Sequence, residues 1–428
     1  MTALKARTLG SIAEVDAKRW NTLLGAPGVA AALPDPAPGS VAAAVPDAAP
    51  GSPNGNASAA VRDAAPFLRH EFLLALEESG CATARTGWAP RHLLLEDASG
   101  ALKAALPLYL KSHSRGEFVF DFSWANAYLQ HGLHYYPKLL SAVPFTPVTG
   151  PRLLIDPRAA ATERRALEDA LVKAAMHYAR AERVSSWHVL FPGDENLEAL
   201  RGAGLIERRD CQFHWHNRGY ESFEAFLATF TAEKRKKAKR ERRRVAEAGI
   251  EFDTRFAGEL DEAAWRSIYE FYADTFYRHG HEPYLNLRFF KLIAARMPER
   301  LMLKIARLAG EPIAVAIFFI GDEALYGRYW GAAGHYHSLH FETCYYQGID
   351  FCIERGLERF EPGTQGEHKV PRGFVPAITV SAHDIVDPRF AAAIRDYAAR
   401  EARGVDRYAA AVNEHIPYHR PSDEELRL

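Results

Sequence analysis

Residues 301–330 read LMLKIARLAGEPIAVAIFFIGDEALYGRYW, and this stretch decides the fold. It contains three apolar runs of strand length: Leu301–Leu308, Pro312–Ile320 and Ala324–Trp330. Two short segments with glycine and acidic residues, 309–311 and 321–323, separate the runs and have the composition of tight turns. Strand-length apolar runs joined by such turns are typical of neighbouring antiparallel strands. The stretch therefore predicts a three-stranded β-meander.

A helix and one more strand are predicted to follow the meander. The helix spans His340–Arg355 and ends at Gly356, since glycine commonly closes a helix, and 358–361 read as the strand. The first half of the chain repeats this order: His92–Leu95, Leu102–Leu110, Glu117–Phe122, then helix Glu163–Glu182 and strand Trp187–Phe191. The chain is therefore predicted to be an α/β protein with two related domains, each a mixed sheet with flanking helices.

Residues 25–66 are predicted to stand outside both domains. The segment is rich in Ala, Pro and Gly and holds no aromatic side chain, so it buries too little apolar surface to order itself. We interpret it as a disordered insertion, and the alternative is a docking arm for a partner. The expected domains are then an N-terminal one, 1–24 with 67–216, and a C-terminal one, 217–428, that includes a basic helix over 221–247.

Composition excludes several classes of protein. A formal net charge of −1 over 428 residues gives no global attraction to nucleic acid or to an anionic membrane. The four cysteines are far apart, which argues against a disulfide framework and a structural zinc site and favours reduced thiols. Residues 1–20 offer no apolar leader, and the longest apolar run, Ile313–Ile320, has strand length. We expect a cytoplasmic protein without a signal peptide or membrane span.

Residues 360–374, FEPGTQGEHKVPRGF, combine three glycines, two carboxylates, one histidine and two cations directly after a short apolar run. Glycines and charges concentrated in a loop are typical of ligand binding rather than of a core. The segment therefore predicts a ligand site. The alternative is a turn held by an ion pair between Glu367 and Arg372.

Five motifs carry a resemblance to a known family: Trp265 with Tyr269-x-Phe271-Tyr272, Pro283-Tyr284-Leu285, Gly327-Arg328-Tyr329-Trp330-Gly331, His340-Phe341-Glu342-x-Cys344-Tyr345-Tyr346-Gln347-Gly348, and the loop Glu361–Phe374. They resemble the bacterial predicted N-acyltransferases called peptidoglycan biosynthesis or recognition proteins, over most of residues 67–415. The element order is similar to the GNAT acyltransferase fold, and two tandem copies resemble the Fem-type transferases. One departure is the 25–66 segment, which separates Trp20 from Phe67, residues expected to lie close in sequence in relatives.

This resemblance implies an N-acyltransferase that moves an acyl group from acyl-CoA to a small-molecule or peptide amine by direct transfer. The usual GNAT pyrophosphate loop, Arg/Gln-x-x-Gly-x-Gly/Ala, is not evident in the sequence, which favours a first alternative: a Fem-type transferase that uses aminoacyl-tRNA and acts on a peptide or cell-wall precursor. A second alternative is a non-catalytic module that recognises a peptidoglycan-type or nucleotide-linked ligand.

Amide formation by direct transfer needs a base near the amine, stabilisation of an oxyanion and a proton for the leaving group. In the 360–374 loop, Glu361 or His368 can accept the amine proton. Lys369 or Arg372 can face the oxyanion or a phosphate. The resemblance to Fem-type enzymes, in which a lysine of the corresponding loop has a charge-stabilising role, favours Lys369.

Further candidates lie on the preceding strand and helix. Glu342 is a catalytic candidate in the first turn of the predicted helix, although the helix dipole also favours a carboxylate there for structural reasons. The predicted substrate- or anion-binding residues are Arg328, Trp330, His340, Tyr346, Gln365, Gly366, Glu367 and Arg372.

Residues 231–245 hold nine Lys or Arg against two Glu. Phe223, Phe226 and Phe230 precede them at helical spacing, which predicts one amphipathic helix with basic flanks. The charges either form a solvated face or bind a polyanion, such as tRNA, a nucleotide-linked precursor or acidic lipid headgroups. The predicted polyanion-binding residues are Lys236, Arg240 and Arg243.

No metal is expected. The spacing His335-x-His337-x-x-His340 superficially resembles a ligand cluster, but no acidic second shell accompanies it. Covalent catalysis is also not supported, because the sequence has no Gly-x-Ser-x-Gly elbow and no signature of a reactive cysteine. Direct transfer is the mechanism that the sequence favours.

Overall fold

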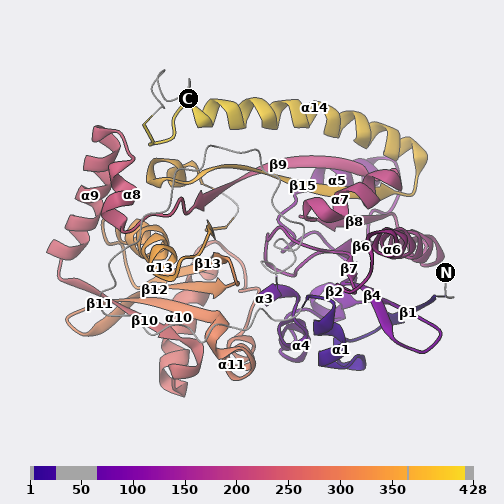
Figure 1. Ribbon diagram of the computed structural model, residues 1–428, viewed down its shortest axis with the longest axis horizontal. Helices are drawn as coiled ribbons and strands as arrows, with labels where there is room; N and C mark the ends of the chain where they lie inside the picture. The colour runs from indigo at the N-terminus through magenta and orange to yellow at the C-terminus, as the bar shows by residue number, and fades with distance from the viewer. Residues whose placement is uncertain (1–3, 26–64, 364–365, 420–428) are drawn as a thin grey trace.

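The computed structural model describes residues 4–25, 65–363 and 366–419, and its two halves form two lobes (Figure 1). The predicted insertion lies outside the described residues except at its ends. The residues that flank it pack together, because the indole N–H of Trp20 donates to the carbonyl of Leu68 over 2.8 Å and both residues are fully buried. The segment therefore interrupts one continuous piece of core.

Eleven strands form a mixed sheet that crosses both lobes. In order across the sheet they are β10 (Ile250–Phe256), β11 (Leu301–Leu308), β12 (Glu311–Ile320), β13 (Ala324–Ala332), β14 (Arg359–Glu361), β9 (Ile206–His216), β15 (Val375–Ile385), β8 (Ser186–Leu190), β6 (Lys138–Ser141), β5 (Tyr109–Lys111) and β2 (Trp88–Pro90). A smaller antiparallel sheet has the order β1 (Lys5–Leu9), β3 (His92–Glu96), β4 (Leu102–Leu106) and β7 (Leu154–Ile155). The predicted mixed α/β fold is confirmed.

The predicted meander is confirmed as β11, β12 and β13, paired in antiparallel order. Side chains of β12 alternate between two helical layers: Ile317 packs in the cluster of α10 (Glu262–Arg278) and α11 (Leu287–Arg296), and Phe318 packs in the cluster of α13 (Gln347–Arg355). A strand covered on both faces needs apolar residues at every position. This requirement explains the unbroken apolar run of β12.

The helix predicted over residues 340–355 is confirmed, with one irregularity. α12 (Leu339–Phe341) leads into a π-helical turn, Glu342–Tyr346, before α13 continues to Gly356, whose φ of 64° closes the helix. Turns of this kind are rare and frequently occur at functional sites. β14 then follows within three residues of Gly356.

β9 and β15 join the two halves of the chain. β9 belongs to the first half, yet its last two residues, Trp215 and His216, pair with β14, and residues 206–214 pair with β15. β15 in turn pairs with β8 of the first half. Figure 1 shows both strands running between the lobes beneath α14 (Pro388–Asn413). The sheet thus crosses the expected boundary at residue 216, and the division into domains stays a prediction.

The predicted strand 102–110 is divided in the structure. Its first part is β4 and its last part is β5, and the two lie in different sheets. Pro107 lies between them and has no N–H to donate to a strand ladder, so the pairing stops there.

The predicted strand Glu117–Phe122 is wrong. Glu117 and Asp121 turn inward to the buried ammonium of Lys138, with 2.7 Å between Lys138 Nζ and Glu117 Oε2. α5 (Phe122–Gln130) begins directly after this turn. The alternation of polar and apolar residues here reflects a buried ionic cluster and not the two faces of a sheet.

The single helix predicted over 221–247 is two helices, α8 (Phe223–Ala228) and α9 (Ala232–Glu247). Between them, the Thr231 N–H donates to the carbonyl of Pro417 over 2.8 Å, and Phe230 forms a β-bridge with Tyr418. These contacts with the end of the chain divert the backbone from the helical path. The phenylalanine stripe itself is buried, as predicted.

The remaining helices cover the N-terminal lobe. The helix predicted over 163–182 is confirmed as α6 (Ala161–Ala181). Shorter helices are α1 (Ala17–Thr22), α3 (Ala65–Leu68), α4 (His70–Glu78) and α7 (Asp194–Gly202). None of the helices that the structure describes is both long enough and apolar enough to cross a membrane.

Candidate active site

The site begins where two parallel strands separate. β13 and β14 pair at three positions, the last of which joins Tyr326 to Glu361, and β13 then continues without β14 to Ala332. The loop after β14 enters the opening and includes a 3₁₀ helix, Glu367–Arg372. The predicted ligand loop therefore lies at a break in the central sheet, where backbone and side chains can reach a ligand.

Glu361 is the last residue of β14 and is 2% exposed. Its Oε1 accepts a hydrogen bond from Arg359 Nε over 3.0 Å, and its Oε2 has no partner among the described residues. Burial raises the pKa of Glu361, but the positive potential of His214, Arg359 and Arg328 outweighs burial and holds the pKa below its usual value. Burial also lowers the pKa of His214. Near neutral pH the positive potential at Glu361 therefore comes from Arg359 and Arg328.

Arg328 extends from β13 toward Glu361. Its Nη1 donates to the carbonyls of Gly327 and Glu361 over 2.9 and 3.3 Å. The guanidinium carbon lies 5.1 Å from the ring centre of Phe67 and 5.0 Å from that of Tyr326. Its Nε and Nη2 are buried without a partner among the described residues. Buried donors of this kind are satisfied by a water or a ligand oxygen.

Lys369 lies in the 3₁₀ helix of the loop after β14 and is 2% exposed. Its Nζ donates to the carbonyl of Gly363 over 2.8 Å. Burial lowers the pKa of Lys369 to about 7, and the charge of Arg328 acts in the same direction. Near neutral pH, Lys369 therefore exchanges readily between an amine, which accepts a proton, and an ammonium, which donates one.

An aromatic wall borders this charged group. The ring of His340 lies 5.4 Å from Trp330 and 5.8 Å from His368, and His368 Nε2 is 2.7 Å from the hydroxyl of Tyr345. Burial lowers the pKa of His340 to about 4, so this imidazole is neutral at physiological pH. Burial also lowers the pKa of His368, which leaves a neutral ring able to accept a proton.

Three other predicted residues form a separate cluster against α9. Glu342 Oε1 accepts hydrogen bonds from Arg242 over 3.1–3.2 Å and from Gln347 over 2.8 Å, and burial raises the pKa of Glu342. The other two residues of this cluster, Tyr346 and Arg372, both contact Glu241 of α9. The Glu241 carboxylate accepts a hydrogen bond from Tyr346 over 2.7 Å and one from Arg372 over 2.8 Å. The guanidinium of Arg372 also lies 3.3 Å above the ring of Phe341. This cluster fixes the loop to α9.

The alternative of an ion pair between Glu367 and Arg372 is wrong. Arg372 pairs with Glu241 of α9, and Glu367 accepts a hydrogen bond from the hydroxyl of Tyr408 over 2.8 Å. Gln365 lies outside the described residues. Gly366 and Glu367 line a cavity of about 580 Å³ beside the loop.

Sequence reasoning missed two kinds of residue. His214 and Gln212 lie on β9, hydrogen-bonded to each other over 3.1 Å, and both are buried beside the loop. The spacing His214-x-His216 was too common to single out, and no local pattern shows that β9 pairs with β14. Glu241 and Arg242 were hidden within a basic run. The usable signal is the spacing of Ala238, Glu241 and Val245, which lie on the buried face of the helix.

The histidines do not gather as metal ligands. Among the residues that the structure describes, no group of three or more His, Cys, Asp or Glu is placed to hold a metal ion. In the 335–340 segment, His337 faces Arg244 over 3.1 Å, while His340 packs against Trp330.

The fold and the site define a two-lobed mixed α/β protein with a buried charged centre where the sheet opens. Its sequence matches the model of the FemAB-like family, described as peptidoglycan biosynthesis/recognition, over residues 51–420. The chain belongs to that family. No curated protein sequence matches it.

Several solved structures are similar to this one. FemX has a TM-score of 0.45 at 11% identity, with 73% of this chain and 92% of that chain covered. The C-terminal domain of a putative lysylphosphatidylglycerol synthetase from Agrobacterium fabrum has a TM-score of 0.43 at 12% identity, with coverage of 76% and 96%. A tandem GNAT protein from the clavulanic acid biosynthesis pathway has a TM-score of 0.41 at 12% identity, with coverage of 90% and 99%.

Proposed function

We propose that this protein is an acyl- or aminoacyl-transferase that forms an amide by direct transfer to an amine. The observation that carries the proposal is Lys369, a buried lysine whose pKa falls to about 7 beside the unsatisfied donors of Arg328. A proton-transfer group poised near neutral pH next to free N–H donors supplies two requirements of acyl transfer. Membership of the FemAB-like family supports the same class of reaction.

In this proposal, the amine nitrogen attacks the acyl carbonyl carbon and a C–N bond forms. The carbonyl oxygen becomes an oxyanion, which the free Nε–H and Nη2–H of Arg328 stabilise. Lys369, as the neutral amine, takes the proton that the attacking nitrogen loses. The bond from carbon to the leaving sulfur or oxygen then breaks, and the Lys369 ammonium returns the proton to that leaving atom. Glu361 acts by position, because its backbone carbonyl and its charge hold Arg328 in place.

The competing assignments within the same site place Glu361 or His368 as the base and give Lys369 a purely electrostatic role. A variant series separates them. Lys369→Arg keeps the positive charge but cannot exchange a proton near neutral pH, whereas Lys369→Met removes both functions. We expect both variants to lower kcat by about 10²–10⁴-fold, while Glu361→Gln and His368→Gln retain the pH dependence of the wild type.

The assay measures amide product by mass spectrometry, with acetyl-CoA and with aminoacylated tRNA as donors and a panel of small amines and peptides as acceptors. Rescue of activity by Lys369→Arg would overturn proton transfer by Lys369. Donor binding without product from any donor would favour the non-catalytic recognition module.

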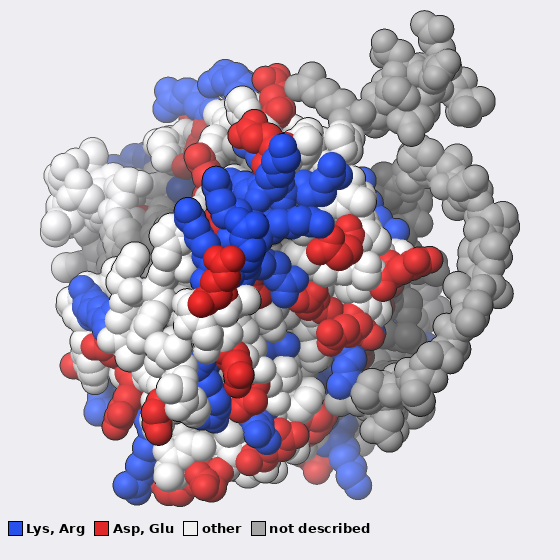
Figure 2. Space-filling model, turned by 90° about the vertical axis from the view of Figure 1, so that its left-hand side faces the viewer, with Lys and Arg blue, Asp and Glu red and all other residues white. Residues whose placement is uncertain are grey.

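The surface of α9 favours aminoacyl-tRNA as the donor. Figure 2 shows a contiguous patch of Lys and Arg side chains on the side of the molecule that carries α8 and α9. Ala238, Glu241 and Val245 form the buried side of α9, so most of its cations point outward. Lys239 pairs with Glu224, and Arg243 pairs with Glu247 over 3.5 Å.

Four exposed cations of α9 have no carboxylate partner among the described residues: Lys236, Lys237, Arg240 and Arg244, the last of which contacts His337. Like charges at this spacing repel one another along a helix, and phosphates would relieve that repulsion. The same helix holds the loop of Lys369 through Glu241 and Arg372. A polyanion bound to α9 would therefore lie beside the element that carries the proposed chemistry.

Binding of bulk aminoacylated tRNA over a range of salt concentrations tests this donor. Each phosphate contact adds about 0.7–0.9 to the slope of log K against log salt. We expect the double variant Lys236→Gln/Arg240→Gln to reduce the slope by about 1.5. The exposed cations Lys173 and Arg288 lie away from α9, and Lys173→Gln/Arg288→Gln is the matched control. Equal slopes for the two double variants would exclude α9 as the tRNA surface.

A further inference from the structure

The cavity beside the ligand loop has two chemically different walls. It measures about 580 Å³, which is large enough for a small organic ligand. Four of its lining residues are phenylalanines, and three, Asp210, Glu367 and Glu401, are carboxylates. None of the thirteen described residues that line it is Lys, Arg or His.

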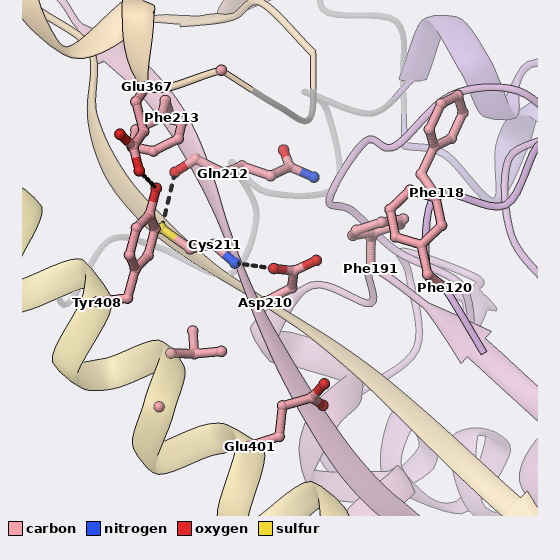
Figure 3. Close-up of a pocket in the computed structure, with 13 residues that line it drawn as sticks. Phe118, Phe120, Phe191, Asp210, Cys211, Gln212, Phe213, Glu367, Glu401 and Tyr408 are labelled. Carbon is pink, nitrogen blue, oxygen red and sulfur yellow. Dashed lines mark hydrogen bonds between the residues drawn. The ribbon is translucent and has the colours of Figure 1, made fainter. Parts of the chain in front are cut away.

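The apolar wall comes from loops of the N-terminal lobe. Figure 3 shows Phe118, Phe120 and Phe191 together on one side of the cavity, facing β9 and α14. Phe120 is 49% exposed, an unusual position for an aromatic side chain next to a cavity. Phe118 and Phe191 adopt φ values of 63° and 52°, a strained conformation for bulky residues. Phe120 thus faces the open space, while Phe191 belongs to the hydrophobic core and Phe118 packs against it, so the cavity opens at the edge of a core.

The opposite wall is acidic. Asp210 on β9 is exposed, and its Oδ1 accepts a hydrogen bond from the neighbouring Cys211 N–H over 2.7 Å. Glu401 of α14 is neutralised by Arg208, with N–O distances of 2.7 and 2.9 Å. Glu367 accepts from the hydroxyl of Tyr408. The carboxylates of Asp210 and Glu367 therefore give the cavity a net negative charge.

The cavity also borders the proposed reaction centre. Gly366 and Glu367, which line it, directly precede His368 and Lys369 in the chain. Gln212 lines it as well and is hydrogen-bonded to His214, which faces Glu361. A molecule held between the two walls thus has one end at the loop of Lys369.

We infer that this cavity is the acceptor site, and that the acceptor is a cationic amine with an aromatic or similarly apolar body. This inference rests on the proposed transferase function and names its acceptor class. The apolar body lies against Phe118, Phe120 and Phe191, and its ammonium group is attracted to Asp210 and Glu367. Anionic acceptors are disfavoured, because they would meet these carboxylates without a compensating cation from the lining.

Binding measured by calorimetry tests the inference without turnover. The probes are three indoles that differ in one terminal group: tryptamine, the neutral alcohol tryptophol and the anionic indole-3-propionate. We expect tryptamine to bind most tightly and the anion most weakly. Asp210→Asn keeps the shape and the backbone hydrogen bond, and it should weaken tryptamine about threefold to fivefold, the range of a partly exposed ion pair. It should leave tryptophol unchanged.

Phe120→Ala should weaken all three probes about tenfold, because the lost aromatic contact is common to them. Two matched controls lie outside the cavity: Phe122, which is 52% exposed beside Phe120, and the exposed Glu270 of α10. Phe122→Ala and Glu270→Gln should bind all probes like the wild type.

The inference would be overturned if indole-3-propionate bound as tightly as tryptamine or more tightly. It would also be overturned if neither Asp210→Asn nor Phe120→Ala changed the affinity for tryptamine. If turnover is observed in a protein that fails these tests, the transferase stands and the acceptor site is elsewhere. If tryptamine binds as expected but no donor yields product, the cavity assignment stands and the transferase does not.

Discussion

Replacement of Lys369 by methionine should stabilise the protein while it lowers kcat by about 10²–10⁴-fold. Lys369 is 2% exposed and has a pKa of about 7 instead of 10.5. Each unit of that difference corresponds to about 1.4 kcal/mol, so burial of the charged lysine costs the folded state roughly 5 kcal/mol at pH values below 7. Methionine has a similar length and no charge. The lost hydrogen bond to Gly363 offsets about 1–2 kcal/mol of the gain.

The sign of the pH dependence follows from proton binding. Between pH 7 and pH 10.5 the unfolded chain keeps the Lys369 proton and the folded chain has lost it, so the stability of the wild type rises with pH in this window. The methionine variant lacks this contribution. Its advantage over the wild type should therefore shrink by about 2–3 kcal/mol between pH 6.5 and pH 9.

Free energies of unfolding from urea titrations at both pH values measure this difference. The control is Lys173→Met, which alters an exposed lysine of α6 and should change stability by less than about 0.5 kcal/mol at either pH. A Lys369→Met advantage that is absent, or that does not vary with pH, would show that Lys369 carries an ordinary proton affinity. The proposed proton transfer would then lose its physical basis.

Two further substitutions test the packing of the two lobes. Lys138→Met should destabilise the protein by about 3–5 kcal/mol, because it leaves the buried carboxylate of Asp121 without its cation and leaves Glu117 only Lys111, at 3.9 Å. Lys103→Met, at a partly exposed pair, should cost less than about 1 kcal/mol by the same thermal or urea measurement. Gly331→Ala should lower the melting temperature by several degrees, because its new Cβ would overlap the backbone oxygen of Phe271, whereas Gly334→Ala meets its nearest atom at 3.7 Å and should be tolerated.

The second half of the chain was predictable because its signals are local. Each strand of the meander is a continuous apolar run bounded by a turn, and the structure buries β12 on both faces, as such a run requires. The helix after the meander is amphipathic and ends at a glycine. The π-helical turn at Glu342 has no local sequence signal; its side chains contact α9, Glu342 through Arg242 and Tyr346 through Glu241.

Two of the failures share one physical cause, which is a partner far away in the sequence, whereas the division of the predicted strand 102–110 has a local cause in Pro107. The polar positions of 117–122 look like one face of a strand, but Lys138 draws them into an ionic cluster. The helix over 221–247 is interrupted because Thr231 donates its backbone hydrogen bond to Pro417 and Phe230 forms a β-bridge with Tyr418. A single sequence contains no local trace of such partners.

The candidate site shows the same difference between local signals and partners that are distant in the sequence. A glycine-rich charged segment after a short strand is a local signal that made Glu361 and Lys369 candidates, and the resemblance to Fem-type enzymes favoured Lys369. The strand exchange that brings His214 and Gln212 to that loop has no local signal. The candidate residues of the loop could thus be named from the sequence and their roles stay predictions, while the environment that lowers the pKa of Lys369 could not be predicted from it.

A net charge near zero conceals two opposite local fields in this molecule. The outer face of α9 is strongly basic, and the cavity between Phe120 and Asp210 is acidic. The 366–372 loop touches both, because Glu367 lines the cavity and Arg372 binds Glu241 of α9. Under the two proposals, a polyanionic donor and a cationic acceptor are each attracted to a surface that repels the other. The two charged surfaces then direct the donor to α9 and the acceptor to the cavity. Lys369 lies in the 366–372 loop, which contacts both surfaces.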